Sequence, residues 1–181
     1  MQNQYQYQNI KPDNDAAFLT PLVAMAGHLL CNTAESIIDN VFRPTVHPQP
    51  GSVVWCELAF GTAEHSGIYV GDNTIVHLNG DGYVECVSPD MFLDRLDGFN
   101  TAFTIYVSGK DSDAVGNNIV SQWALDKVGE KLDYNLLTNN CHRFTSGCLT
   151  GNFDNDDVLM CLLKITVRQE LGSDSWYAWE R

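Results

Sequence analysis

The chain has 181 residues and a formal net charge of −13 at pH 7, with 23 acidic and 10 basic side chains. This charge argues against a nucleic-acid-binding surface and against simple electrostatic docking on an anionic membrane, because both need clustered positive charge. The length and a hydrophobic content of 44% suffice for one domain with a hydrophobic core.

The first 47 residues divide into a polar tail and an apolar segment. Residues 1–15 are rich in Gln, Asn and Tyr, which predicts a flexible tail, and the apolar residues of 16–47 predict accessory N-terminal helices. The apolar run at 16–31 follows a long polar tail instead of a short basic leader and is too short to span a membrane. The six cysteines include no Cys-x-x-Cys pair, which favours a reducing compartment over a disulfide framework. We therefore expect a cytoplasmic protein without a signal peptide.

Residues 48–151 show predicted strands framed by helices without regular βαβ alternation, which is typical of an α+β domain with a mainly antiparallel sheet. A strand is predicted at 53–58 and a hairpin over 64–78. The remaining predicted elements are strands at 83–87 and 101–107 and helices at 88–96 and 111–128. Residues 152–181 should form a C-terminal helical extension, with a helix at 154–171 and a Trp-rich tail of unknown role.

Two of these helices have a predicted inner face. Ser88 should cap the helix at 88–96, whose inner face is Met91, Phe92 and Leu96. The helix at 111–128 should bury an apolar stripe, which consists of Val115, Ile119, Val120, Trp123, Ala124 and Val128.

The register of the hairpin decides whether His65 and His77 meet. If 71–73 is a three-residue loop with Asn73 in the left-handed conformation, Gly67 lies opposite His77 and leaves room for its imidazole. The two histidines are then diagonal neighbours on one face of the hairpin. The apolar residues that point to the other face, into the core, are Ile68, Val70, Val76 and Leu78. A two-residue turn would place the histidines on opposite faces.

The segment around Cys141 predicts a helix that begins at this cysteine. Asn139 and Asn140 are good N-cap residues, and apolar or small side chains follow at helical spacing until Gly151 can close the helix. In the first turn, unpaired N–H groups and the helix dipole favour a thiolate over a thiol. A lone cysteine on a helix is more often a small buried hydrophobe, so this segment alone leaves both interpretations open.

Cys141, His65 and His77 together supply the residue types of a thiol acyl-transfer site. Such a site needs a cysteine thiolate, a histidine that takes and passes its proton, and a polar residue that orients the histidine. A zinc ion held by the same three residues is the alternative, but their spacing lacks the short pairs of most zinc sites. We expect no metal and no cofactor.

The other histidines and cysteines show no such pattern. His142 follows Cys141 directly, and because neighbours on a helix point about 100° apart, we expect it to be exposed or to cap the helix. The remaining cysteines are mostly flanked by apolar residues and should lie in the core; they are Cys31, Cys56, Cys86, Cys148 and Cys161.

The pattern His-x-x-Ile-Tyr-x-Gly-(x)5-His, which runs from His65 to His77, is followed by Asn-Cys-x-x-Phe at 140–144. Together they resemble the lecithin:retinol acyltransferase family, a circularly permuted branch of the NlpC-like papain-fold superfamily. The sequence Pro-Gly-Ser-Val-Val at 50–54 is similar to the opening of that domain. The desumoylating isopeptidases, a second permuted papain-like group, resemble the segment 134–141 about as well. Those enzymes use a single histidine, so the pair of histidines favours the first family.

The resemblance implies Cys141 as the nucleophile, His65 as the general base and His77 as the residue that orients it. It also implies a permuted papain-like α+β fold, with a mainly antiparallel sheet packed on helices and the nucleophile at a helix N-terminus. The family usually has an acidic residue after the cysteine, where this chain has His142.

For function, the resemblance implies a cysteine-dependent enzyme that acts on lipid esters, as a phospholipase A or an acyltransferase, through an acyl-cysteine. Two alternatives stay open: an amidase or peptidase that cleaves peptidoglycan peptides or protein conjugates, and a catalytically inactive binding module. The expected partners are a lipid or amide substrate and, transiently, a membrane surface, with apolar residues of 18–30 and 158–167 sheltering an acyl chain. The resemblance also admits a toxin exported by a specialised secretion system, whose partner would be a cognate inhibitor.

Overall fold

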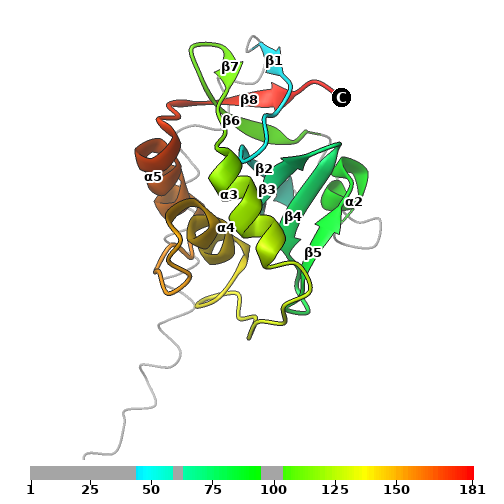
Figure 1. Cartoon of the computed structure of the whole chain (residues 1–181), viewed down its shortest axis with the longest axis vertical. Coiled ribbons are helices and arrows are strands. Elements are labelled where there is room, and N and C mark those ends of the chain that lie inside the picture. Colours follow the sequence, from blue (N-terminus) through cyan, green and yellow to red (C-terminus); the bar gives the residue numbers. More distant parts are fainter. Residues whose placement is uncertain (1–43, 59–62, 95–103) are drawn as a thin grey trace, which may run out of the picture.

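The structure is a computed structural model that describes residues 44–58, 63–94 and 104–181. The tail and the helices predicted for 1–47 therefore lie outside the described residues, apart from the last four positions. In the described part, the chain forms a mixed α/β fold in which one mainly antiparallel sheet packs against helices (Figure 1).

The sheet has the strand order β1-β8-β6-β2-β3-β4-β5, and β7 pairs with β6. Its strands are β1 (Thr45–Val46), β2 (Val53–Leu58), β3 (Ala63–Gly71), β4 (Thr74–Leu78), β5 (Val84–Val87), β6 (Tyr106–Lys110), β7 (Asp113–Ala114) and β8 (Ser175–Trp179). Strand β2 and the β3–β4 hairpin confirm the predicted elements. The strand predicted at 101–107 is displaced, since β6 begins at Tyr106, and 101–103 lie outside the described residues.

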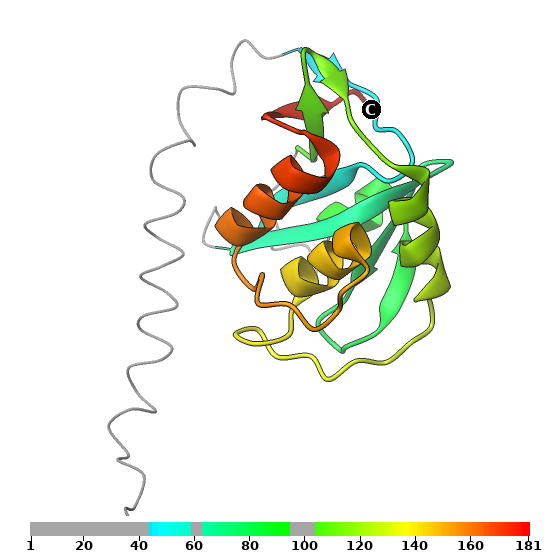
Figure 2. The same ribbon diagram turned by 60° about the vertical axis from the view of Figure 1, so that its left-hand side comes forward.

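The C-terminal strand β8 occupies a place where the sequence predicts only a Trp-rich tail. It pairs in parallel with β1 and antiparallel with β6, so it lies between two strands from earlier in the chain (Figures 1 and 2). Its side chains alternate, because Tyr177 and Trp179 are buried while Trp176 and Ala178 are less so. The end of the chain is therefore an interior part of the sheet.

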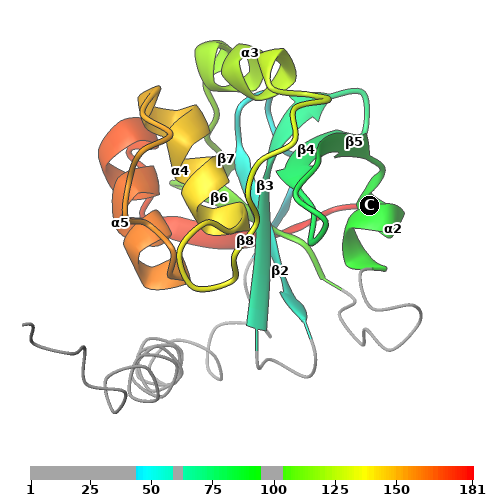
Figure 3. The ribbon, with the colours of Figure 1, turned by 90° about the horizontal axis from the view of Figure 1, so that it is seen from below.

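The helices lie on both sides of the sheet. They are α2 (Pro89–Leu93), α3 (Asn118–Asp126), α4 (Cys141–Thr150) and α5 (Met160–Leu171). Figure 3 shows α3, α4 and α5 on one side and α2 on the other. Among the described residues, no helix has both the length and the hydrophobicity that a membrane crossing requires.

Helix α3 is shorter than the predicted helix at 111–128. It begins at Asn118 because the Asn117 side chain accepts a hydrogen bond from the Ile119 N–H and caps the helix. Of the predicted stripe, Val120 and Ala124 are buried, but Ile119, Trp123 and Val128 are exposed, so that part of the prediction is wrong. In α2, Ser88 caps the helix and Phe92 is buried as predicted, whereas Met91 is exposed. This helix ends at Leu93, before the predicted end at 96, and Leu96 lies outside the described residues.

Helix α5 begins at Met160, later than the predicted helix at 154–171. Met160, Leu163 and Val167 all point into the core. These side chains therefore hold the helix against the sheet, while Ile165 is exposed, and the expectation that 158–167 shelters an acyl chain stays a prediction. The second expected shelter, 18–30, lies outside the described residues.

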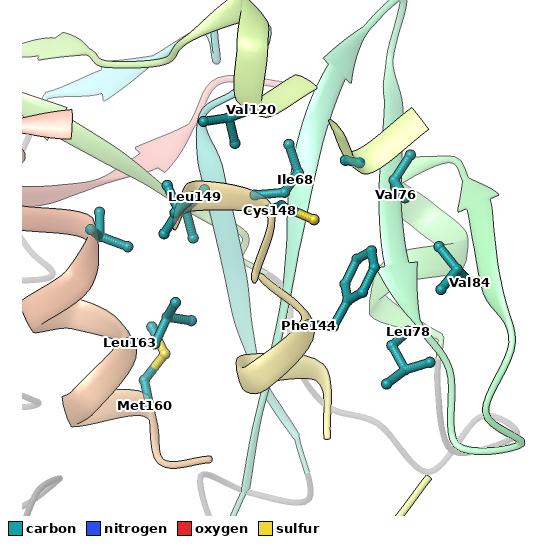
Figure 4. Close-up of a cluster of buried hydrophobic side chains, with 13 residues drawn as sticks. Ile68, Val76, Leu78, Val84, Val120, Phe144, Cys148, Leu149, Met160 and Leu163 are labelled. Carbon is teal, nitrogen blue, oxygen red and sulfur yellow. The ribbon is translucent and has the colours of Figure 1, made fainter. Parts of the chain in front are cut away.

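Two hydrophobic cores lie on the two sides of the sheet. The larger one joins the sheet to α3, α4 and α5 and contains Ile68, Val76 and Leu78 from the hairpin (Figure 4). The smaller one contains Phe92 of α2 with Val54, Cys56 and Ile75 from the strands. Cys56 and Cys148 are buried as predicted, but Cys86 is exposed and Cys161 is only partly buried, while Cys31 lies outside the described residues.

The β3–β4 hairpin reaches the predicted register through a different turn. Asp72 and Asn73 both have positive φ, at 49° and 53°, as in the two-residue turns favoured by twisted hairpins. A β-bulge between Tyr69 and Gly71 adds one residue to β3. Turn and bulge together shift the pairing as a three-residue loop would, so Ile68 pairs with Val76. The predicted loop type is wrong, and the register that depends on it is confirmed.

Candidate active site

Cys141 is the first residue of α4, as the sequence predicts. The Asn140 side chain caps the helix by accepting hydrogen bonds from the backbone N–H groups of His142 and Arg143. Its amide nitrogen also donates to the carbonyl oxygens of Leu136 and Val158, at 2.9 and 2.8 Å. Asn140 therefore ties the start of α4 to the loops on either side, which fixes the position of Cys141.

The hairpin brings the two predicted histidines together. His65 Nε2 and His77 Nδ1 lie 3.0 Å apart, and both side chains are buried. Gly67 allows this approach, since a Cβ atom there would lie 3.1 Å from the Cβ of His77. The Phe92 ring packs against both imidazoles, with centroid distances of 4.8 and 5.8 Å. The predicted diagonal contact of the histidines is thus present.

Glu85 extends this pair and is absent from the sequence-based site. Strands β4 and β5 pair His77 with Glu85, and His77 Nε2 lies 3.3 Å from the Glu85 carboxylate. A signal for it exists, because counting outward from the turn at 80–82 sets residue 85 opposite residue 77.

The contacts of His77 determine the protons on both imidazoles. An ionised carboxylate can only accept, so His77 carries its proton on Nε2, and its Nδ1 then accepts from His65 Nε2–H. His65 is left with Nδ1 for the hydrogen bond that it makes with the Cys141 side chain. Cys141, His65, His77 and Glu85 are therefore linked in one series.

The electrostatic surroundings of Cys141 favour its thiolate. Burial alone raises the pKa of the Cys141 thiol. The charge of His65 and hydrogen bonds from the His65 side chain and from the Ser66 backbone and side chain outweigh burial, so this pKa lies below the usual value of a cysteine. For Cys148, on the same helix, burial raises the pKa. Burial and then the negative charge of Cys141 raise the pKa of Tyr134, so that phenol stays protonated beside the thiolate.

His142 corrects the expectation of an exposed or capping side chain. It is 2% exposed, and its Nδ1 lies 2.9 Å from Ser66 Oγ and 3.9 Å from Cys141 Sγ. The reason is tertiary, because α4 packs against β3 and the His142 side chain contacts Ser66 of that strand. Neither Ser66 nor His142 is in the sequence-based site.

Within the described residues, no group of three or more His, Cys, Asp and Glu side chains is arranged to hold a metal ion. The hydrogen bond between the two histidines uses a nitrogen of each ring, and His77 gives its second nitrogen to Glu85. The zinc alternative would require these contacts to break.

Comparisons with known proteins match the same part of the chain. The family model described as lecithin retinol acyltransferase matches residues 47–154, which is more than half of the sequence. The matched segment runs from β2 through α4 and contains Cys141, His65 and His77. The search of curated proteins found no match.

Proposed function

The chain belongs to the lecithin retinol acyltransferase family, and on that basis we propose that it is a cysteine-dependent enzyme that transfers acyl groups from lipid esters. The family in general supports an acyltransferase or phospholipase type of function. The observation that carries the proposal for this chain is the linked series of Cys141, His65 and His77, with the cysteine in the first turn of α4. The chain order His65, His77, Cys141 supports a circularly permuted papain-like topology.

In the first half of the proposed reaction, His65 Nδ1 takes the proton of the Cys141 thiol. The thiolate attacks the carbonyl carbon of the ester, forming an S–C bond and an oxyanion. The backbone N–H of Cys141 at the helix start is a suitable donor to that oxyanion. As the C–O bond breaks, His65 returns the proton to the departing alcohol. The products are a lysolipid and a thioester on Cys141.

In the second half, water or the hydroxyl of an acceptor lipid gives its proton to His65 and attacks the thioester. The C–S bond breaks, and the cysteine regains the proton from His65. His77 takes no proton in either half. It accepts the His65 Nε2–H bond and so holds the base in the tautomer whose Nδ1 faces the sulfur, while Glu85 does the same for His77.

The proposal is tested with phosphatidylcholine and phosphatidylglycerol vesicles. We expect free fatty acid and lysolipid to form, and a peptide containing Cys141 to gain a fatty-acyl mass that hydroxylamine removes. The anionic vesicles should react more slowly because the chain has a net charge of −13. Cys141→Ala should abolish these products, while Cys148→Ala should keep them.

A different outcome would identify the alternative substrate class. If no lipid is consumed while a muropeptide or a ubiquitin-like conjugate is cut in a Cys141-dependent manner, the protein is an amide-cleaving enzyme. If Cys141 reacts with a thiol probe but no substrate of either class is turned over, the binding module is favoured.

A further inference from the structure

A second buried polar cluster lies beside Cys141, between α4 and β3. Its members are Ser66 of β3 and His142 and Thr145 of α4, all of which are almost wholly buried. Ser66 Oγ lies 2.9 Å from His142 Nδ1 and 3.0 Å from Thr145 Oγ1. Ser66 follows His65 directly, and because side chains alternate along a strand, the two residues leave β3 on opposite faces. Hydrogen bonding from both residues nevertheless lowers the pKa of the Cys141 thiol.

Counting protons assigns the direction of each bond in this cluster. Thr145 Oγ1 donates its only proton to the Cys141 carbonyl oxygen at 2.8 Å, so it accepts from Ser66. Ser66 has one proton. If His142 Nδ1 were an acceptor, His142 and Thr145 would both need that proton, and one buried contact would be left without a hydrogen. If His142 carries its proton on Nδ1, both contacts are satisfied.

With His142 as the donor, the Ser66 hydroxyl can donate a hydrogen bond to Cys141 Sγ. His142 Nδ1–H donates to Ser66 Oγ and fixes that oxygen, so His142 does not need the single Ser66 proton, which goes to Thr145 Oγ1 as long as Cys141 is a thiol. Once Cys141 loses its proton to His65, the thiolate is the stronger acceptor, and the Ser66 hydroxyl turns toward it. The Ser66 backbone N–H supplies a second donor to the same sulfur.

We propose that His142 is a positioning residue that acts through Ser66 to stabilise and orient the Cys141 thiolate, while His65 alone carries the proton. The inference rests on the proposed function in so far as Cys141 is the nucleophile. It gives the two buried histidines next to the sulfur different tasks. It also explains why a histidine directly after the cysteine is buried against β3.

The test measures how fast iodoacetamide alkylates Cys141 as a function of pH, by mass spectrometry of the Cys141 peptide. His142→Leu removes the Nδ1–H donor, and Ser66→Ala removes the hydroxyl. Each should raise the pH at which Cys141 becomes reactive by about one unit, which means about tenfold slower alkylation at mildly acidic pH. At alkaline pH, where the thiol is ionised in every variant, the rates should converge. His142→Asn, whose amide nitrogen can replace Nδ1, should recover most of the lost rate.

Ser146→Ala is the matched control. Ser146 is equally buried on α4, but its hydroxyl donates to Asp157 at 2.6 Å instead of to the sulfur. This variant should melt at a lower temperature and keep the alkylation profile of the unmodified chain.

Two results would overturn the proposal: a Ser66→Ala profile that matches the unmodified chain, or a His142→Asn variant that alkylates as slowly as His142→Leu. If His142→Leu does not fold, the alkylation profile of Ser66→Ala still tests the proposal. Iodoacetamide reports the reactivity of Cys141 without any lipid. A failure of this proposal can therefore be told apart from a failure to find a lipid substrate.

Discussion

At the scale of single residues, two cysteines on one helix have opposite surroundings. Cys141 at the start of α4 has a pKa below the usual cysteine value, whereas burial raises the pKa of Cys148 about two turns further on. Cys86 is exposed, and its partial burial also raises its pKa. The low pKa of Cys141 arises from its contacts with His65 and Ser66.

Cys141 should therefore be the most reactive described cysteine near neutral pH. A lowered pKa keeps the thiolate populated below the usual cysteine pKa and loses it only as the pH falls through the lowered value. In a pH series of iodoacetamide labelling, we expect Cys141 to react at lower pH than Cys86 although Cys86 is more exposed. Cys141→Ala should abolish turnover with little loss of stability, while Cys148→Ala should cost about 1–2 kcal/mol of unfolding free energy. Equal labelling of Cys86 and Cys141 would contradict this view.

The histidines should be unequal in their effect on turnover. His65→Ala removes the proposed base and should cost about as much as Cys141→Ala, since residues that act as a unit are not additive. His77→Gln should cost less, because its amide oxygen can still accept from His65 Nε2–H. Single-turnover acylation rates separate these effects from substrate binding. Equal losses for the two variants would overturn the division of tasks.

Glu85 offers a finer test of the same series. Glu85→Ala should slow acylation about tenfold, and Glu85→Gln should restore most of the rate because its amide oxygen still accepts from His77 Nε2–H. Glu130→Ala is the control, since the Glu130 carboxylate pairs with Lys127 near the surface. A Glu85→Ala variant as fast as Glu130→Ala would remove Glu85 from the site.

At the scale of elements, the hairpin places the site by its register. The alternation of apolar residues predicted which face of the sheet each side chain takes. The two-residue turn and the bulge next to it produce the strand pairing that this alternation requires. The turn type itself was not predictable by pattern, because Gly-Asp-Asn suits both a three-residue loop and a two-residue turn with a bulge. The same counting of residues from the turn at 80–82 would have predicted that Glu85 of β5 lies opposite His77.

Gly67→Ala tests the closeness of β3 and β4. A Cβ atom at this position would lie 2.8 Å from the Val76 carbonyl oxygen and 2.9 Å from a methyl group of Ile75. We expect a loss of about 1–3 kcal/mol in unfolding free energy, because such overpacking forces the strands apart. Turnover should fall as well, since His77 would shift. Gly80→Ala, where a Cβ atom meets nothing within 4 Å, is the control and should leave both unchanged; thermal melting and acylation rates provide the comparison.

At the scale of the whole molecule, contacts between distant segments explain what local patterns missed. The prediction for His142 considered only directions on an isolated helix, while its burial comes from packing of α4 on β3. Strand β8 has alternating side chains, but its partners β1 and β6 lie far away in sequence. Sequence reasoning could place the three residues of the proposed site together because a helix cap and a hairpin, both local features, position them.

The position of β8 predicts that the C-terminal residues are needed for folding. Deleting 173–181 would remove the partner of β1 and one of the partners of β6, and it would take Tyr177 and Trp179 out of the smaller core. We expect this variant to lose its cooperative thermal transition, because several kcal/mol of apolar burial disappear at once. Removing Arg181 alone should change stability by less than about 1 kcal/mol, since its exposed ion pair with Asp90 contributes little. A truncated chain that melts like the intact one would show that β8 is not needed for folding.

The bulge between Tyr69 and Gly71 also sets which changes in chain length this protein can tolerate. Deleting the one extra residue of β3 would turn every side chain on the part of β3 before the bulge to the opposite face of the sheet. Ser66 would then lie on the face that His65 now occupies, and His65 on the face of Ser66. Substitutions in the turn leave that parity intact. In a library of deletions and insertions, single-residue changes here should eliminate the site as completely as replacing the cysteine, while changes of two residues preserve the alternation. Whether the number of residues between the turn and His65 is odd or even therefore decides which face of the sheet His65 takes.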